Sequence, residues 1–251
     1  MDPAQQDPDR QTDRTTGEQA AGPSLATRLA MLCILAVALG YTEAAVVVYL
    51  RALIAPLRAK HFPDAAAESL PLLSVEQLQA GGEQFTQALL IEVTREPVPL
   101  VLLLAVAWGF RRGRGQVVGF FLIGFGLWDI GYYAFLKLLL GWPDSLGTWD
   151  VLYLIPTAWV APVWAPLAIS VTMLAAGLAV VHRGGFRRGK GALLAWPAVA
   201  AGVALVLTTF VLRTEEAFDA VPARYDWGVF WAGWAVGAAG LAWLLWPDIR
   251  R

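Results

Sequence analysis

Six charged side chains fall inside the long apolar stretches of this 251-residue sequence. One Asp, Arg or Lys at the centre of a membrane helix costs about 2.5–3.5 kcal/mol, so six without partners would cost on the order of 15–20 kcal/mol. That sum exceeds a typical folding stability. We therefore expect these side chains to face a bundle interior, to pair, or to line water. They are Glu43, Glu92, Arg95, Glu96, Asp129 and Lys137.

Spacing places several of these residues on single helix faces. Glu92, Arg95 and Glu96 stand at i, i+3 and i+4, so they share one side of a helix. Asp129 and Tyr133 are four residues apart and share a face in the same way. Each of these two stretches is therefore expected to carry one polar stripe.

The depths of these residues in the membrane place the polar stripes at a similar level. Glu43 lies roughly 10 Å below the outer end of its stretch at 1.5 Å per residue, and it shares a face with Arg51 two turns outward. The other acids fall at similar levels in the outer half of the membrane, whereas Lys137 lies near a helix end and can extend to the boundary. We expect a polar cluster for binding or proton relay, made of Glu43, Glu92, Arg95, Glu96, Asp129, Tyr132, Tyr133 and Arg51.

Carboxylates outnumber cations among the six charged residues. The four acids against Arg95 and Lys137 leave a charge of −2. In a low dielectric such an excess favours protonation of one acid, recruitment of Arg51, or a bound cation. A divalent ion would suit four carboxylates, but Arg95 in their midst argues against it, so no metal is predicted. An ion-pair network that only holds the helices in register is the alternative.

Several classes of site and partner are excluded by the residues that are missing. His61 lies in the connection between the first two apolar stretches, His182 lies at the end of the fourth stretch, and Cys33 is the only cysteine, which disfavours haem, iron–sulfur and cysteine-based zinc sites. We find no nucleotide-binding or hydrolase motif, so no cofactor and no catalytic residue is assigned. The net charge of −1 offers no basic surface for nucleic acid.

The composition indicates which kind of structural element holds this cluster in place. With 57% hydrophobic and 16% charged residues and a mean hydropathy of +0.55, the chain reads as an integral membrane protein in contact with the lipid bilayer. About 20 apolar residues span the hydrocarbon core as a helix. We predict an all-α bundle of six transmembrane helices at 29–50, 86–110, 116–140, 151–181, 191–212 and 227–246.

The predicted domain organisation is simple. Residues 1–27 read as a disordered cytoplasmic tail, and residues 28–248 form the transmembrane domain. The outer connection 51–85 is the only long one, and its part 65–79 is apolar enough for a short surface helix. The fourth span, 151–181, is too long for one straight helix, and its three prolines predict a kink or a break.

The distribution of Arg and Lys predicts the orientation. Twelve lie in the tails and connections on one side of the six spans and five on the other. By the positive-inside rule both termini face the cytoplasm, and we expect the bacterial inner (plasma) membrane. Tryptophans at predicted helix ends, Trp142 and Trp149 among them, are expected to anchor the protein at the membrane interface.

Three functions remain open. The first is a proton-coupled carrier or binder of a small polar solute, which accounts for the excess of acids. The second is a structural or assembly subunit of a membrane complex, alone or as an oligomer. The third is an enzyme acting on a lipid-linked substrate at the outer leaflet, with Glu92, Glu96 or Asp129 as acid or base and an arginine as anion clamp.

Overall fold

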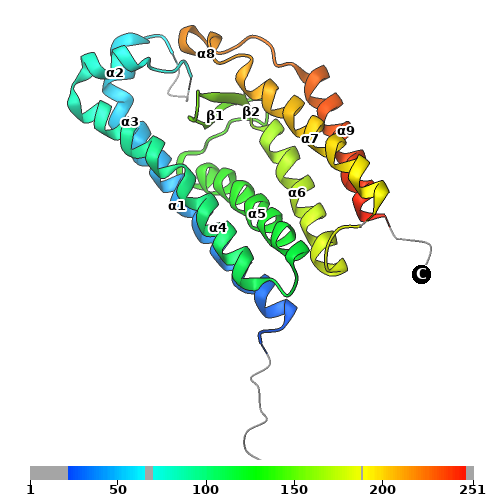
Figure 1. The fold of residues 1–251 in the computed structure, drawn as a ribbon. Helices are drawn as coiled ribbons and strands as arrows, with labels where there is room; N and C mark the ends of the chain where they lie inside the picture. Colours follow the sequence, from blue (N-terminus) through cyan, green and yellow to red (C-terminus); the bar gives the residue numbers. More distant parts are fainter. Residues whose placement is uncertain (1–21, 66–69, 188, 247–251) are drawn as a thin grey trace, which may run out of the picture.

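The computed structural model describes residues 22–65, 70–187 and 189–246, and this part of the chain is mostly helical (Figure 1). Most of the predicted tail, residues 1–21, and the end of the predicted domain, residues 247–248, lie outside the described residues. The elements are α1 (Leu25–His61), α2 (Val75–Gly81), α3 (Glu83–Arg95), α4 (Pro97–Phe110), α5 (Arg114–Leu140), β1 (Trp149–Tyr153), β2 (Trp159–Pro162), α6 (Trp164–Arg183), α7 (Lys190–Val211), α8 (Glu216–Asp219) and α9 (Trp227–Leu245).

Within the described ranges, five helical segments are long and apolar enough to cross a membrane. They contain α1, α5, α6, α7 and α9, which confirms the membrane character of the chain. The predicted span 86–110 is instead built from two consecutive helices, α3 and α4, that meet at Glu96. Pro97 and Pro99 lack backbone N–H donors, so the helical hydrogen-bond ladder is interrupted at this point.

The predicted fourth span, 151–181, is helical only from Trp164 onward. Residues 149–162 form an antiparallel hairpin of β1 and β2, with Asp150 opposite Ala161, and α6 begins only at Trp164. Aromatic and β-branched residues favour strands, and Pro156 and Pro162 oppose a helix. The chain is therefore broken here rather than kinked.

Close backbone approach at glycines sets the arrangement of the long helices. In Figure 1, α5 lies between α1 and α6, and α7 runs beside α9. A Cβ at Gly126 of α5 would lie 2.6 Å from the Ser170 carbonyl oxygen of α6. A Cβ at Gly202 of α7 would lie 2.4 Å from the backbone nitrogen of Gly237 in α9. These contacts admit only glycine, as expected for membrane helices that approach through small residues.

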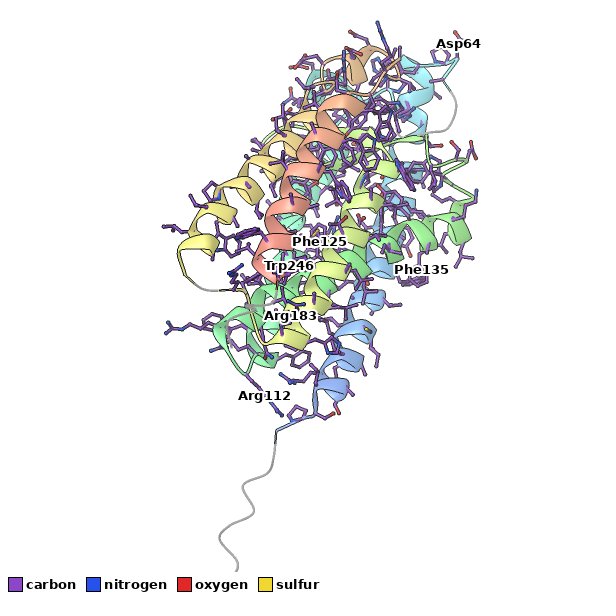
Figure 2. All side chains as sticks on the ribbon, turned by 90° about the vertical axis from the view of Figure 1, so that its right-hand side faces the viewer. Asp64, Arg112, Phe125, Phe135, Arg183 and Trp246 are labelled. Carbon is purple, nitrogen blue, oxygen red and sulfur yellow. The ribbon has the colours of Figure 1, made fainter. Side chains whose placement is uncertain are left out.

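The connections gather at two ends of the bundle. At one end Arg112 donates to the Pro23 carbonyl and the Arg187 N–H donates to the Leu244 carbonyl, so both described chain ends lie beside basic connections. Figure 2 shows Arg112 and Arg183 toward this end and Asp64 at the other. Five membrane-length helices and the α3–α4 pair therefore run between two chemically different ends.

The short surface helix predicted at 65–79 forms only in its last part. Helix α2 starts at Val75, after a Ser74–Gln77 capping box, and residues 70–74 are not helical. Residues 66–69 of the predicted 65–79 helix lie outside the described residues. The Leu72 N–H donates to the Ala217 carbonyl at 2.7 Å, which ties this connection to the α7–α9 half of the molecule.

The hairpin sits in the core and not at the interface. Trp149 is 8% exposed and packs edge-on against Tyr225, in a cluster with Val160, Phe210 and Phe230. Trp142 is 5% exposed. The prediction that Trp142 and Trp149 anchor the protein in the lipid interface is therefore wrong. Burial of Tyr225 raises the pKa of its hydroxyl well above the usual range.

Candidate functional site

A cavity of about 1520 Å³ lies between the two halves of the bundle. Its walls come from α1, the α3–α4 junction, α5 and β1 on one side and from α6, α7 and α9 on the other. All the predicted cluster residues except Arg95 line it, and Arg95 contacts two residues that do. The polar residues on its wall include Glu43, Arg51, Glu92, Glu96, Asp129, Tyr132, Tyr133, Asp150, Ser170 and Thr172.

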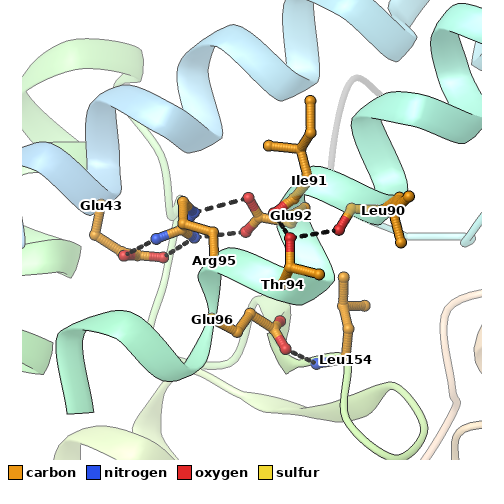
Figure 3. Close-up of polar contacts among 8 residues, drawn as sticks. All are labelled: Glu43, Leu90, Ile91, Glu92, Thr94, Arg95, Glu96 and Leu154. Carbon is orange, nitrogen blue, oxygen red and sulfur yellow. Dashed lines mark hydrogen bonds and ion pairs between the residues drawn. The ribbon is translucent and has the colours of Figure 1, made fainter. Parts of the chain in front are cut away.

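Arg95 holds α1 to α3 through two carboxylates (Figure 3). Its Nη1 and Nη2 atoms each donate to one oxygen of Glu43 at 2.7 Å, which is a bidentate pair. Its Nε and Nη2 atoms donate to Glu92 at 2.9 and 2.5 Å. The three side chains are 13–23% exposed. The positive charge of Arg95 is therefore fully engaged by two acids.

Asp150 is a second centre of the site, and it is not among the site residues predicted from the sequence. It is 2% exposed and accepts hydrogen bonds from the hydroxyls of Tyr133 at 3.1 Å and Tyr132 at 3.3 Å. Arg51 Nη2 lies 4.0 Å from Asp150 Oδ1, and the Arg51 guanidinium stacks 4.1 Å from the ring centroid of Trp142. Glu43 and Arg51 share one face of α1 but bind different partners, Arg95 and Asp150 respectively. Strand β1 carries Asp150 back between the helices.

Glu96 and Asp129 differ from the other acids. Glu96 Oε2 accepts a hydrogen bond from the Leu154 N–H at 3.1 Å, on the side away from Arg95 (Figure 3). Asp129 Oδ2 accepts one from the Ser170 hydroxyl at 2.7 Å. Among the described residues neither carboxyl forms a salt bridge within 4.0 Å. The site therefore has two acids that form hydrogen bonds but have no ion-pair partner in the described part of the chain.

The charge balance of the site is more acidic than the sequence suggested. The cavity wall carries six carboxylates, those of Glu43, Glu92, Glu96, Asp129, Asp144 and Asp150, and Arg51, Arg58 and the adjoining Arg95 supply three guanidinium groups, so full ionisation would give −3. Lys137 does not offset this, since its ammonium donates to the Gly141 and Pro143 carbonyls at the end of α5, in keeping with the predicted boundary role. In the described part of the chain, no three Asp, Glu, His or Cys side chains gather tightly enough to hold a metal ion.

The cavity wall is exposed at two places. Near the acids the lining residues Ala52, Ala55 and Asp144 are exposed at the end of the bundle. Farther along, Val118 of α5 and Val203 of α7 line the cavity and are 41% and 50% exposed. The site is therefore not a sealed network inside the bundle.

Sequence signals for the missed residues were weak. Asp150 lies in WDVLY, which resembles WDIGY at 128–132, but the first segment is strand β1 and the second lies within α5, so the likeness gives no signal for the site. Ser170 is one small hydroxyl within an apolar helix. Their contacts depend on the hairpin and on the close approach of α5 and α6 at Gly126.

Comparisons of this chain with protein-family models, curated proteins and solved structures give no match.

Proposed function

We propose that this chain binds a small solute in the cavity and carries it across the membrane in exchange for protons. The observation that carries the proposal is that Glu96 and Asp129 line the cavity without a salt-bridge partner among the described residues. A buried carboxylate in a low dielectric is costly when ionised and unpaired. It is stabilised either by a proton or by a positively charged ligand, and exchange between the two couples binding to proton release.

The other two functions have less support. A purely structural subunit would be expected to pair its buried charges, as Arg95 does with Glu43 and Glu92, and to leave no large cavity beside them. An enzyme that clamps a phosphate needs a guanidinium directed at the ligand, but Arg95 is surrounded by carboxylates, Arg51 pairs with Asp150, and Arg58 donates to the Leu70 and Pro71 carbonyls.

The proposed setting is the bacterial inner membrane with both termini in the cytoplasm. It rests on the excess of Arg and Lys in the tails and connections on one side of the spans. In this orientation the acids lie in the outer half of the membrane, close to the exposed lining residues Ala52 and Asp144.

The test is proton release on binding. The purified protein in lipid nanodiscs would be mixed with a panel of small amines, and a pH-sensitive dye would report the protons released. We expect release from the wild type and a reduced signal for Asp129→Asn and for Glu96→Gln. Asp144→Asn is the control, because Asp144 is an exposed cavity-lining acid in a connection. Equal release from all four proteins, or none from the wild type with any amine, would refute the proposal.

A further inference from the structure

The cavity has two chemically different ends. The acids, the two tyrosines and Arg51 occupy the end formed by α1, the α3–α4 junction, α5 and β1. The other end is almost entirely apolar. Its lining residues include Phe121, Leu122 and Phe125 of α5, Met173 and Ala176 of α6, Val199 and Val203 of α7, and Leu241 of α9.

The apolar end is a groove that faces the bilayer. Helix α6 lies between α5 and α7 (Figure 1) and supplies its floor, while α5 and α7 supply the walls. Val118, Trp196 and Val203 on these walls are 41%, 43% and 50% exposed. Because they lie on membrane-length helices, this exposed surface meets lipid tails. A ligand with an apolar chain can therefore enter sideways from the membrane.

The groove is long enough for such a chain. Val118 and Asp129 both line the cavity and are separated along α5 by about 16 Å at 1.5 Å per residue. Between them the wall carries Phe121, Leu122 and Phe125, with no charged side chain. The groove thus runs from the lipid-facing surface to the acid at its polar end.

The polar end selects the charge of the ligand. Six carboxylates against three guanidinium groups give a negative field that repels phosphate and attracts a cation. Trp128, Tyr132 and Tyr153 also line this end, and aromatic faces favour an ammonium group. A lipophilic ammonium ion therefore complements both parts of the cavity.

We infer that the solute is an amphiphilic amine, with its ammonium group beside Asp129 at the polar end of the cavity and its alkyl chain in the groove between α5 and α7. This inference rests on the proposed function and adds the substrate class and the route of entry to it. When the ligand binds, its ammonium group takes the place of one proton on the carboxyl groups. The net charge of the site is therefore the same before and after binding, and no other ion is needed.

The experiment uses dodecylammonium, dodecyl phosphate and butylammonium as probes on the protein in phosphatidylcholine nanodiscs, with intrinsic tryptophan fluorescence as the signal. Nanodiscs containing phosphatidylethanolamine test whether a lipid head group supplies the amine. Val203→Trp narrows the groove from its exposed wall. Val236→Trp is the matched control, since Val236 is 40% exposed on α9 and does not line the cavity.

We expect dodecylammonium to bind at least about tenfold more tightly than dodecyl phosphate or butylammonium. Asp129→Asn should weaken dodecylammonium binding about tenfold or more, and Val203→Trp should weaken it while Val236→Trp does not. Competition by phosphatidylethanolamine would identify the source of the amine as a lipid head group, and a lack of competition would identify a free amine.

Two results would overturn the inference. If dodecyl phosphate binds as tightly as dodecylammonium, the cavity does not select a positive charge. If butylammonium binds as tightly as dodecylammonium and Val203→Trp has no effect on binding, the alkyl chain does not occupy the groove. In the second case, butylammonium binding that still depends on Asp129 would leave the proposed function standing. If no amine responds to Asp129→Asn, the proposed function itself fails.

Discussion

Arg95 should be the most important single charge for the stability of this protein. Arg95→Met leaves Glu43 and Glu92 facing each other without the cation that binds both. Loss of one partner from a buried ion pair costs about 3–5 kcal/mol. Because the three side chains keep 13–23% exposure, we expect the low end of this range, about 3 kcal/mol. For a chain of this size that corresponds to a fall in Tm of about 6–12 °C.

The assay is thermal unfolding of purified protein in one detergent, with Glu43→Gln and the double variant completing a double-mutant cycle. The coupling between the two sites should be about 1 kcal/mol or more. Lys137→Met is the matched control, because it also removes one positive charge, from the next predicted span, but the Lys137 ammonium contacts only carbonyls. It should lower the free energy of unfolding by less than about 1 kcal/mol. An Arg95→Met variant as stable as the control, with additive effects in the cycle, would refute the argument that this network holds α1 to α3.

Three further predictions concern packing, the second polar centre and topology. Gly202→Ala should destabilise by about 1–3 kcal/mol, because its Cβ would overlap the α9 backbone, whereas Gly109→Ala, with nothing within 4 Å, should be neutral or slightly stabilising in the same thermal assay. Tyr133→Phe removes a hydrogen bond to the buried Asp150 and should lower stability by about 1 kcal/mol, and a Tm equal to the wild type would contradict that contact. A cysteine at Asp144, in a Cys33→Ser background, should react with a membrane-impermeant thiol reagent from the outside of cells, and labelling only from the cytoplasmic side would reverse the proposed topology.

The ion pair of Arg95 could be anticipated from the sequence because helix geometry determines it. The i, i+3 spacing puts Glu92 and Arg95 on one face, and depth counted from the span ends puts Glu43 at the same level. The structure pairs all three. The membrane helices were predictable for a similar reason, since their signal lies in local composition.

The polar centre at Asp150 could not be anticipated in the same way. An apolar, proline-containing run has no periodicity that separates a buried hairpin from a broken helix, and the hairpin is what turns Asp150 inward. The groove between α5 and α7 exists because these two helices do not pack against each other. Contacts between other helices, such as Gly126 with Ser170 and Gly202 with Gly237, determine this arrangement. Such long-range packing leaves little trace in any one segment.

The most direct test of the account is whether a cation from outside can reach the acid-lined cavity. Val47 lines the cavity one turn from both Glu43 and Arg51, so Val47→Cys in a Cys33→Ser background would report access, with the exposed α1 residue Val37→Cys as the lipid-facing control. We predict that a trimethylammonium methanethiosulfonate labels Val47→Cys faster than the sulfonate analogue, that dodecylammonium slows this labelling, and that Val37→Cys is unreactive. Labelling of Val47→Cys that is absent, or faster with the anionic reagent, would contradict a cation-binding cavity open to the outer side.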